Sequence, residues 1–193
     1  MMPDCLSSDE KKNLLRIARQ ALMLAVNNQP VPPVDVKGLT LLLRENGASF
    51  VTLTEGGDLR GCVGALEPSM PLADDVQYHA IAAALQDYRF PPVRPDEVAR
   101  IVIEISRLTL PQPLPYQDPQ DLLTKLRPHI DGVILKDGFR RATFLPQVWE
   151  KLPQPRAFLA HLCQKMGAPS DLWERRELQV LIYQVEEFHE PLV

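Results

Sequence analysis

The sequence predicts an α+β fold with mostly antiparallel sheets and flanking helices. Two stretches have the alternation and central turn residues of β-hairpins, and helical patterns separate these hairpins. A parallel sheet would need a regular strand–helix–strand alternation, which this chain lacks. With 193 residues, 45% of them hydrophobic, the chain can bury a sizeable core, and its length fits one domain or two closely connected lobes.

A helix and an extended connection are predicted for the first 40 or so residues. Ser7 and Glu10 have the spacing of a capping box, in which a serine and a glutamate satisfy the first free amides of a helix. Apolar residues recur at helical intervals after them, so the helix is expected to continue to about Asn27. The prolines within Pro30–Pro33 exclude helix, and an extended surface connection is expected as far as Gly38.

A β-hairpin, a helix and a strand are predicted next. Alternating β-forming residues at Ser49–Thr54 lead into Gly56-Gly57, which suits a tight turn, and Leu59–Leu66 forms the returning strand. Small residues recur at helical spacing over Leu72–Asp87, which predicts a closely packed helix. Ile101–Ser106 alternates apolar and polar side chains, as does a strand with one buried face.

The second half of the chain is predicted to be a mixture of short helices and strands. Its proline-rich stretch Pro111–Pro115 favours extended chain, and Asp118-Pro119 has the cap and first-turn proline of a helix start. Gly138 suits the turn of a second hairpin. The predicted elements are a helix to about Leu126, strands at Val133–Leu135 and Phe139–Phe144, helices at Pro146–Lys151 and Pro155–Met166, and a final strand within Glu177–Phe188.

Charge and cysteine content exclude several classes of function. The formal net charge is -4 and the basic residues form no stripe, which nucleic-acid binding needs, so no nucleic acid is expected as a partner. Cys5, Cys62 and Cys163 lie far apart and lack the paired spacing of zinc ligands or of a disulfide framework. The sequence identifies no cofactor.

No membrane association is expected. The longest apolar runs, such as Ala21–Val26 and Ala80–Leu85, are too short to cross a bilayer. Residues Met1–Ser7 have neither the basic region nor the apolar region of a secretory signal, so a cytoplasmic location is expected.

The segment Leu59–Leu66 is the strongest candidate for a site, because two glycines flank a cysteine inside a predicted strand. Strand alternation places Arg60, Cys62 and Gly64 on one face. A neighbouring arginine favours the thiolate, and the absent side chain at Gly64 leaves room for a ligand, which together describe a reactive cysteine. The alternative is structural: a buried cysteine acts as a small hydrophobic residue, and the glycines allow a bulge or close packing.

Two further features bear on this candidate site. A cysteine nucleophile needs a base, and His79 is the nearest histidine in sequence, although a lone histidine on a helix is commonly structural. Asp87 and Arg89 stand where the same helix ends. They either orient a substrate or pair with Cys62, or they bind the carbonyls of the helix end while Phe90 anchors the turn.

A second hairpin carries an arginine pair, Arg140 and Arg141. Alternation places Arg141 and Thr143 on one face of the strand and Arg140 on the other, so one arginine is expected to turn inward. An inward arginine beside a threonine can hold a carboxylate or a phosphate by two hydrogen bonds. The alternative is a solvated arginine pair on a hairpin.

Four separated motifs in this order resemble the AMMECR domain family, whose bacterial and archaeal members are also labelled AmmeMemoRadiSam system protein A. The motifs are F-V-T-L-T (Phe50–Thr54), L-R-G-C-V-G-A-L-E-P (Leu59–Pro68), D-Y-R-F-P-P (Asp87–Pro92) and R-A-T-F-L-P-Q-V-W (Arg141–Trp149). The resemblance covers nearly the whole chain.

The resemblance implies one domain over residues 1–193, with two unequal lobes and a cleft between them. In that family the larger lobe comes from both chain ends and the smaller from an internal segment. Its biochemical function is unresolved, the L-R-G-C-hydrophobic-G motif is the proposed site, and the label suggests MEMO-like and radical-SAM protein partners. The candidate site residues carried over by motif are Arg60, Gly61, Cys62, Gly64, Asp87, Arg89, Phe90 and Arg141.

The chain departs from the family pattern in the predicted helix before Asp87. His79, Leu85 and Gln86 stand where the family is expected to have Asn, Phe and Arg. This departure argues against a mechanism that relies on His79 as a base shared by the family.

Two hypotheses about function follow from the sequence. In the first, the protein is a cysteine-dependent modification enzyme with a small-molecule ligand: Cys62 is the nucleophile or redox thiol, Arg60 favours its thiolate, and Asp87 and Arg89 orient the site. In the second, it is a non-catalytic interaction or adaptor module whose motif is a binding surface or a backbone lock. The two hypotheses differ in whether the thiol of Cys62 reacts.

Overall fold

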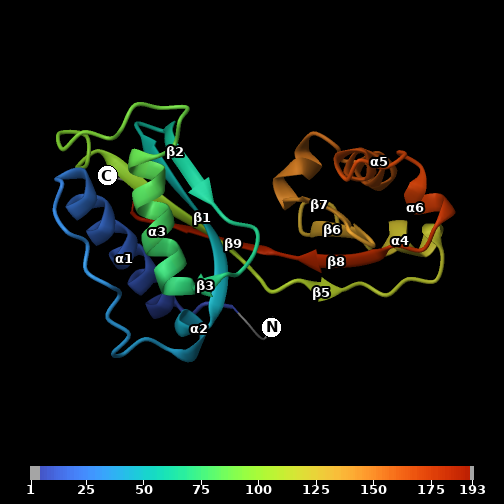
Figure 1. Cartoon of the computed structure of the whole chain (residues 1–193), viewed down its shortest axis with the longest axis horizontal. Coiled ribbons are helices and arrows are strands. Elements are labelled where there is room, and N and C mark those ends of the chain that lie inside the picture. The colour runs from blue at the N-terminus through green and yellow to red at the C-terminus, as the bar shows by residue number, and fades with distance from the viewer. Residues whose placement is uncertain (1–4, 192–193) are drawn as a thin grey trace. The chain divides into compact units, whose positions relative to one another are not determined.

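The computed structural model describes residues 5–191 of the chain. These residues form two units, each with its own sheet and hydrophobic core (Figure 1). Unit 1 contains the described residues up to Thr109 and those from Glu186 onward, and unit 2 is Leu110–Val185. Both ends of the described chain therefore belong to unit 1.

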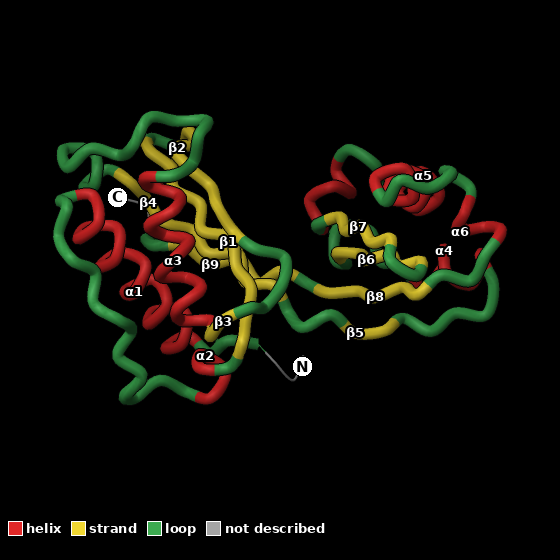
Figure 2. Tube along the Cα trace, in the orientation of Figure 1, coloured by secondary structure: helices red, strands yellow, loops and turns green. Residues whose placement is uncertain are grey.

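Unit 1 is built on a five-stranded sheet (Figure 2). Its strands follow the order β2-β1-β4-β9, and β3 pairs with the start of β1. Strand β1 is antiparallel to both β2 and β4. The elements of unit 1 are α1 (Ser8–Val26), α2 (Leu41–Arg44), β1 (Asn46–Glu55), β2 (Asp58–Gly64), β3 (Met70–Pro71), α3 (Leu72–Leu85), β4 (Ile101–Leu108) and β9 (Val185–His189).

The helices α1 and α3 pack against each other and against one face of this sheet (Figure 2). Alternate residues of β1 and β4 point into this layer because successive side chains of a strand face opposite ways. These residues, among them Val51, Leu53, Ile103 and Ile105, are fully buried in the core of unit 1. The intervening residues of β1 and β4, such as Thr52 and Glu104, are mostly half-buried and point to the face of the sheet away from α1 and α3. We call this face the open face.

The first hairpin has the predicted turn and one unpredicted irregularity. Gly56 and Gly57 have positive φ angles of 61° and 92°, which a tight two-residue turn requires. Opposite Leu53–Thr54 the register shifts by one residue, so that Arg60 has no partner on β1. Such a bulge redirects the side chain of the extra residue, and the strict alternation expected for Arg60 and Cys62 is interrupted there.

Unit 2 packs helices against a four-stranded antiparallel sheet of order β5-β8-β6-β7. Trp149 is central to its core: the indole stacks on Phe158 with 3.7 Å between ring centroids, and its N–H donates to the carbonyl of Asp131 at 2.7 Å. The elements of unit 2 are β5 (Gln112–Pro113), α4 (Pro119–Lys125), β6 (Gly132–Asp137), β7 (Arg140–Phe144), the 3₁₀ helix η1 (Pro146–Glu150), α5 (Pro155–Lys165), α6 (Leu172–Arg175) and β8 (Gln179–Tyr183).

The predicted fold class and helix starts are confirmed. The Glu10 amide donates to Ser7 Oγ at 3.3 Å, and the Ser7 amide donates to the Glu10 carboxylate at 2.7 Å, which is the predicted capping box of α1. Asp118 caps α4, and Gly167, with a φ of 74°, follows α5. No helix within residues 5–191 has the length and apolar character needed to cross a membrane.

Several predicted element ends differ from the structure by one to three residues, and two differences matter for the site and the sheets. Helix α3 ends at Leu85 instead of Asp87, because the amide of Gln86 closes the last turn on Ala82 and the chain then leaves the helix. The predicted final strand is in fact two strands, separated at Gln184, one in each sheet. The continuous run of β-forming residues near the end of the chain therefore forms one strand of each sheet, β8 in unit 2 and β9 in the sheet of unit 1.

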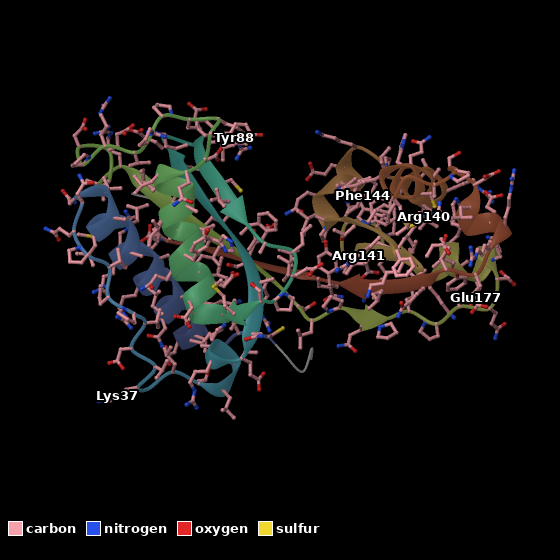
Figure 3. The ribbon with its side chains drawn as sticks, viewed as in Figure 1. Lys37, Tyr88, Arg140, Arg141, Phe144 and Glu177 are labelled. Atoms are coloured by element: carbon pink, nitrogen blue, oxygen red, sulfur yellow. The ribbon has the colours of Figure 1, made fainter. Side chains whose placement is uncertain are left out.

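The prediction of an inward arginine on β7 is also wrong. Arg140 and Arg141 are both exposed (Figure 3), and Arg140 lies 3.7 Å from the carboxylate of Asp137. The core side of β7 is filled instead by Ala142, with Phe144 packed against the same core. Because β7 is an edge strand, long charged side chains on it reach solvent easily.

Replacing Ser7 tests the capping box. We expect Ser7→Ala to lower the free energy of unfolding by about 1 kcal/mol, because the Glu10 amide loses its acceptor. Urea denaturation measures the change, and Ser8→Ala, at the exposed next position, is the control. Equal stabilities of the two variants would contradict the prediction.

Candidate functional site

The candidate site lies on β2, at the edge of the sheet of unit 1. Cys62 is directly opposite Thr52 of β1. Residues directly opposite in an antiparallel pair point to the same face, so both side chains lie on the open face. The hydroxyl of Thr52 donates a hydrogen bond to Sγ of Cys62 at 3.3 Å, and both residues are half-buried.

Gly61 allows α3 to lie directly against β2. A Cβ atom at this position would stand 2.2 Å from the backbone carbonyl oxygen of Ala83. A backbone atom of a packed helix cannot move aside as a flexible side chain can. Glycine is therefore required here by the close approach of helix and strand.

Gly64 has a different neighbour. A Cβ there would lie 2.4 Å from the ring of Phe50 and 2.5 Å from the carbonyl oxygen of Ser49. The space that the sequence assigned to a ligand is thus occupied by the ring of Phe50.

The outer edge of β2 is bound by side chains at Cys62. An edge strand has N–H and C=O groups without a strand partner. The amide of Cys62 donates to Asp87 Oδ2 at 2.8 Å, and Arg89 Nη2 donates to the carbonyl oxygen of Cys62 at 3.0 Å. Arg89 also binds both carboxylate oxygens of Asp87, at 2.9 and 2.6 Å. We call this arrangement the Asp87–Arg89 clamp.

Asp87 is ionised in this clamp. Its side chain is 4% exposed. Hydrogen bonds, first from the Arg89 guanidinium and then from the Cys62 and Arg89 amides, hold the pKa of Asp87 well below its usual range, although burial acts in the opposite direction. The early end of α3 at Leu85 makes the clamp available, because it leaves Asp87 in a loop that can turn back to β2.

Arg60 binds the same loop further along. Its guanidinium pairs with the buried carboxylate of Glu97 through two hydrogen bonds of 3.1 Å. It also donates to the carbonyl oxygens of Pro91 and Pro92, at 2.9 and 3.3 Å. Arg60 in turn holds the pKa of Glu97 below its ordinary value. Among the described residues, the hydrogen bonds of Arg60 thus go to the loop and not to the Cys62 thiol.

Phe90 belongs to the loop that carries the clamp. Its amide donates to the carbonyl of Asp87 at 3.0 Å, which closes a turn, and the Arg89 guanidinium lies 5.6 Å from the centroid of its ring. Phe90 is half-buried, whereas Tyr88 in the same turn is 96% exposed (Figure 3).

His79 lies on the side of the sheet opposite to the thiol. Its Nδ1 is 3.2 Å from Asp75 Oδ2, and the same oxygen accepts the hydroxyl of Ser49 at 2.6 Å. Ser49 is three residues from Thr52 on β1, so its side chain points to the opposite face of the sheet, toward α3. His79 therefore does not face Cys62.

Arg141 is not part of the group around Cys62, since it is on β7 in unit 2, opposite Lys136. The structure adds three residues to the site that the sequence did not single out: Thr52, Glu97 and Glu104. Glu104 is opposite Thr52 on β4, and alternation along β4 could have found it. Thr52 could not be found in the same way, because the bulge at Arg60 shifts the register of the hairpin by one residue.

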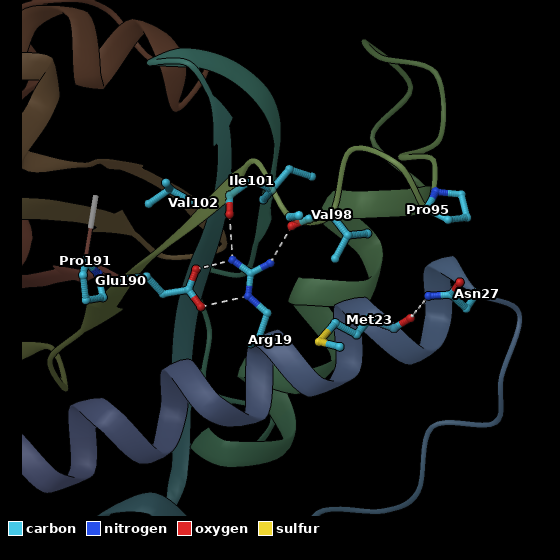
Figure 4. Close-up of a pocket in the computed structure, with 10 residues that line it drawn as sticks. Arg19, Met23, Asn27, Pro95, Val98, Ile101, Val102, Glu190 and Pro191 are labelled. Carbon is cyan, nitrogen blue, oxygen red and sulfur yellow. Dashed lines mark hydrogen bonds and ion pairs between the residues drawn. The ribbon is translucent and has the colours of Figure 1, made fainter. Parts of the chain in front are cut away.

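A cavity of about 650 Å³ lies elsewhere in unit 1, between α1, the loop before β4 and residues near the end of the described chain (Figure 4). Its one arginine, Arg19, is fully engaged: it pairs with Glu190 and donates to the carbonyls of Val98 and Ile101. None of the predicted site residues lines this cavity. Within residues 5–191, no group of three or more His, Cys, Asp or Glu side chains is placed to hold a metal ion.

Adding a methyl group at Gly61 tests the close approach of α3. We expect Gly61→Ala to lower the free energy of unfolding by about 2 kcal/mol, because the new Cβ meets the carbonyl oxygen of Ala83. Chemical denaturation measures the loss. Asp58→Ala, at an exposed position of the same strand, is the matched control. Wild-type stability of Gly61→Ala would refute the steric argument.

The clamp can be tested through its pH dependence. We expect Asp87→Asn to lower the free energy of unfolding by about 2 kcal/mol at neutral pH. Because the folded-state pKa of Asp87 lies below its ordinary value of 3.8, the carboxylate stabilises the fold fully above that value and loses its contribution as pH falls below it. The difference between wild type and variant should therefore narrow in acid.

The control for this experiment is Asp96→Asn in the same loop. Asp96 is mostly exposed and paired with Arg94, so its loss should change stability by less than about 0.5 kcal/mol. A difference between wild type and Asp87→Asn that stays constant from pH 7 to pH 2 would contradict the assignment of the clamp.

Comparison with known proteins gives the family. The model of the AMMECR1 family matches residues 15–188. A protein of Methanothermobacter thermautotrophicus is 38% identical over 193 residues, 96% of each chain, and one of Thermofilum pendens is 37% identical over 202 residues, 96% of this chain and 92% of its own. The crystal structure of uncharacterised protein PH0010 from Pyrococcus horikoshii matches with a TM-score of 0.73 and 32% identity, over 96% of this chain and 94% of that one. The chain thus belongs to the AMMECR1 family, as its four motifs predict.

Proposed function

We propose that the protein is a cysteine-dependent enzyme that modifies a ligand on the open face of unit 1, with Cys62 as its nucleophile. The observation that supports this proposal is the clamp at Cys62: Asp87 and Arg89 hold both backbone polar groups of this residue, while its thiol stays half-buried on the open face. A nucleophile needs a fixed position and access to substrate, and the held backbone and partial exposure of Cys62 support the proposal on both points.

Cys163 gives an internal comparison. It lies in the core of unit 2 with 0% exposure, and burial raises the pKa of its thiol. This is the pattern of an inert cysteine that acts as a small hydrophobic residue. Cys62 differs in its exposure, in the hydrogen bond from Thr52, and in the charged groups that hold its backbone.

The residues around Cys62 take distinct roles in this proposal. Cys62 attacks the ligand, and Thr52 orients its sulfur through the hydrogen bond to Sγ. Asp87 and Arg89 are positioning residues because they act on the backbone of Cys62. Arg60 holds the loop that carries them by its pair with Glu97, a role that differs from the thiolate-favouring one suggested by its sequence position.

A non-catalytic interaction module is the second candidate, and one observation favours it. The charged groups of Arg60, Asp87 and Arg89 all bind within unit 1. Under this alternative the motif is a backbone lock that presents the loop after α3 to a partner, with Tyr88 at its exposed tip. MEMO-like or radical-SAM partners, a small-molecule ligand and a cytoplasmic location stay predictions under either candidate.

Cysteine alkylation separates the two candidates. We expect iodoacetamide to modify Cys62 in the folded protein at a rate at least tenfold above that of the buried Cys163, because exposure controls access of the reagent. Peptide mass spectrometry follows each cysteine separately, and labelling is repeated from pH 6 to pH 9.

The matched variant is Cys62→Ser, which keeps the backbone that the clamp binds. It should unfold with nearly wild-type stability if the thiol serves chemistry. The enzyme proposal would be rejected if Cys62 were as unreactive as Cys163 up to pH 9 and Cys62→Ser clearly lost stability. That result would favour the non-catalytic interaction module.

A further inference from the structure

Three polar side chains form a row across the open face of unit 1. Thr52 on β1 is directly opposite Cys62 on β2 and directly opposite Glu104 on β4. Because direct partners in antiparallel strands share a face, the order across the sheet is thiol, hydroxyl, carboxylate. All three residues are half-buried. We call them the Cys62–Glu104 row.

Glu104 differs from the other carboxylates held in unit 1. Asp87 pairs with Arg89, Glu97 with Arg60, Glu190 with Arg19, and Glu186 with Lys11 and Arg107. Glu104, in contrast, has no hydrogen bond or ion pair with any residue between 5 and 191. A half-buried carboxylate on the middle of a sheet has given up part of its hydration, and a cation that reaches it gains an attraction stronger than in bulk water.

The spacing and surroundings of the row limit the ligand. Neighbouring strands lie about 4.8 Å apart, so the Cα atoms of Cys62 and Glu104 are separated by two such steps, roughly 10 Å. Phe50 and Val102 are half-buried on the same face of their strands, on either side of the row. A ligand with a short, extended chain and a charged group at one end would fit along such a row. A large flat ring system would not be required to span it.

We infer that the ligand of this face carries a cationic amine or guanidinium group that binds Glu104, while its other end lies at the thiol of Cys62. This inference rests on the proposed function, because it names the substrate class of the same site. Glu104 is then the specificity residue, and Thr52 contacts both the sulfur and the middle of the ligand.

Two thiol reagents of equal size and opposite charge test this inference. The probes are the methanethiosulfonates that carry a trimethylammonium-ethyl or a sulfonato-ethyl group. In each reaction the sulfur of Cys62 attacks the reagent's sulfenyl sulfur, a disulfide forms, methanesulfinate leaves with the electron pair of the broken S–S bond, and the thiol proton goes to solvent. The ratio of the cationic to the anionic labelling rate at Cys62 is measured by peptide mass spectrometry at low ionic strength.

We expect this ratio to fall about fivefold in Glu104→Gln, because the carboxylate attracts one reagent and repels the other over a distance shorter than the screening length at low ionic strength. Glu104→Lys should reverse the preference. Asp58→Asn removes an exposed carboxylate from the same strand as Cys62 and should leave the ratio at its wild-type value. Melting temperatures confirm that each variant is folded before it is labelled.

The outcomes separate the two proposals. If Cys62 is labelled fast and the ratio of cationic to anionic labelling rates is the same in wild type, Glu104→Gln and Glu104→Lys, the inference of a cationic ligand is overturned. The proposal of a reactive thiol at Cys62 then still stands. A Cys62 that neither reagent modifies overturns both. An equal fall of the ratio in Asp58→Asn and Glu104→Gln also overturns the inference, because it assigns the effect to the general charge of the surface.

Discussion

The unpaired outer edge of β2 is the constraint on which the candidate site depends. An edge strand presents amides and carbonyls that must be bound by something, and at Cys62 they are bound by a carboxylate and a guanidinium that also bind each other. The carboxylate of Asp87 and the guanidinium of Arg89 thus each bind both Cys62 and one another. Loss of Asp87 would leave the amide of Cys62 without its acceptor and the guanidinium of Arg89 without its carboxylate, which is why a single residue in a loop matters to the whole edge.

The clamp acts together with a second attachment of the same loop. Arg60, the extra residue of the bulge in β2, binds Glu97 and the carbonyls of Pro91 and Pro92. The loop is therefore tied to β2 on both sides of Gly61. The missing side chain of Gly61 lets α3 approach, and α3 in turn leads directly into the loop. Strand, helix and loop hold one another, so a change at any of them should weaken the others.

Local signals predicted much of this arrangement, and long-range pairing accounts for the rest. The capping box of α1, the two-glycine turn and the motif cysteine could be found from the sequence because each depends on neighbouring residues. The sequence predicts the end of α3 two residues too late, because Gln86 and Asp87 do not themselves break a helix. The partner of Arg60 is 37 residues away, and no local pattern marks Glu97 as that partner.

The open face likewise combines features that local sequence predicts with features that depend on long-range strand pairing. Its members come from three strands, and the order thiol, hydroxyl, carboxylate depends on the register of β1 with both of its neighbours. Alternation alone predicts that Glu104 faces away from the core. The bulge at Arg60 shifts the register of the hairpin by one residue near its turn, so the row could not be assembled from the sequence without knowing where the bulge lies.

The contacts of β2 with α3 and with the loop after it explain the glycine, the arginine and the aspartate of the motifs, but they do not explain the cysteine. Gly61 is needed because the carbonyl oxygen of Ala83 leaves no room for a Cβ. Arg60 pairs with Glu97, and Asp87 accepts the amide of Cys62. From Cys62 the clamp uses only the backbone N–H and C=O, which every residue other than proline supplies. A serine or an alanine would satisfy the clamp equally well. The identity of this side chain therefore serves something on the open face, where its neighbours are a hydroxyl and a carboxylate that has no partner among residues 5–191.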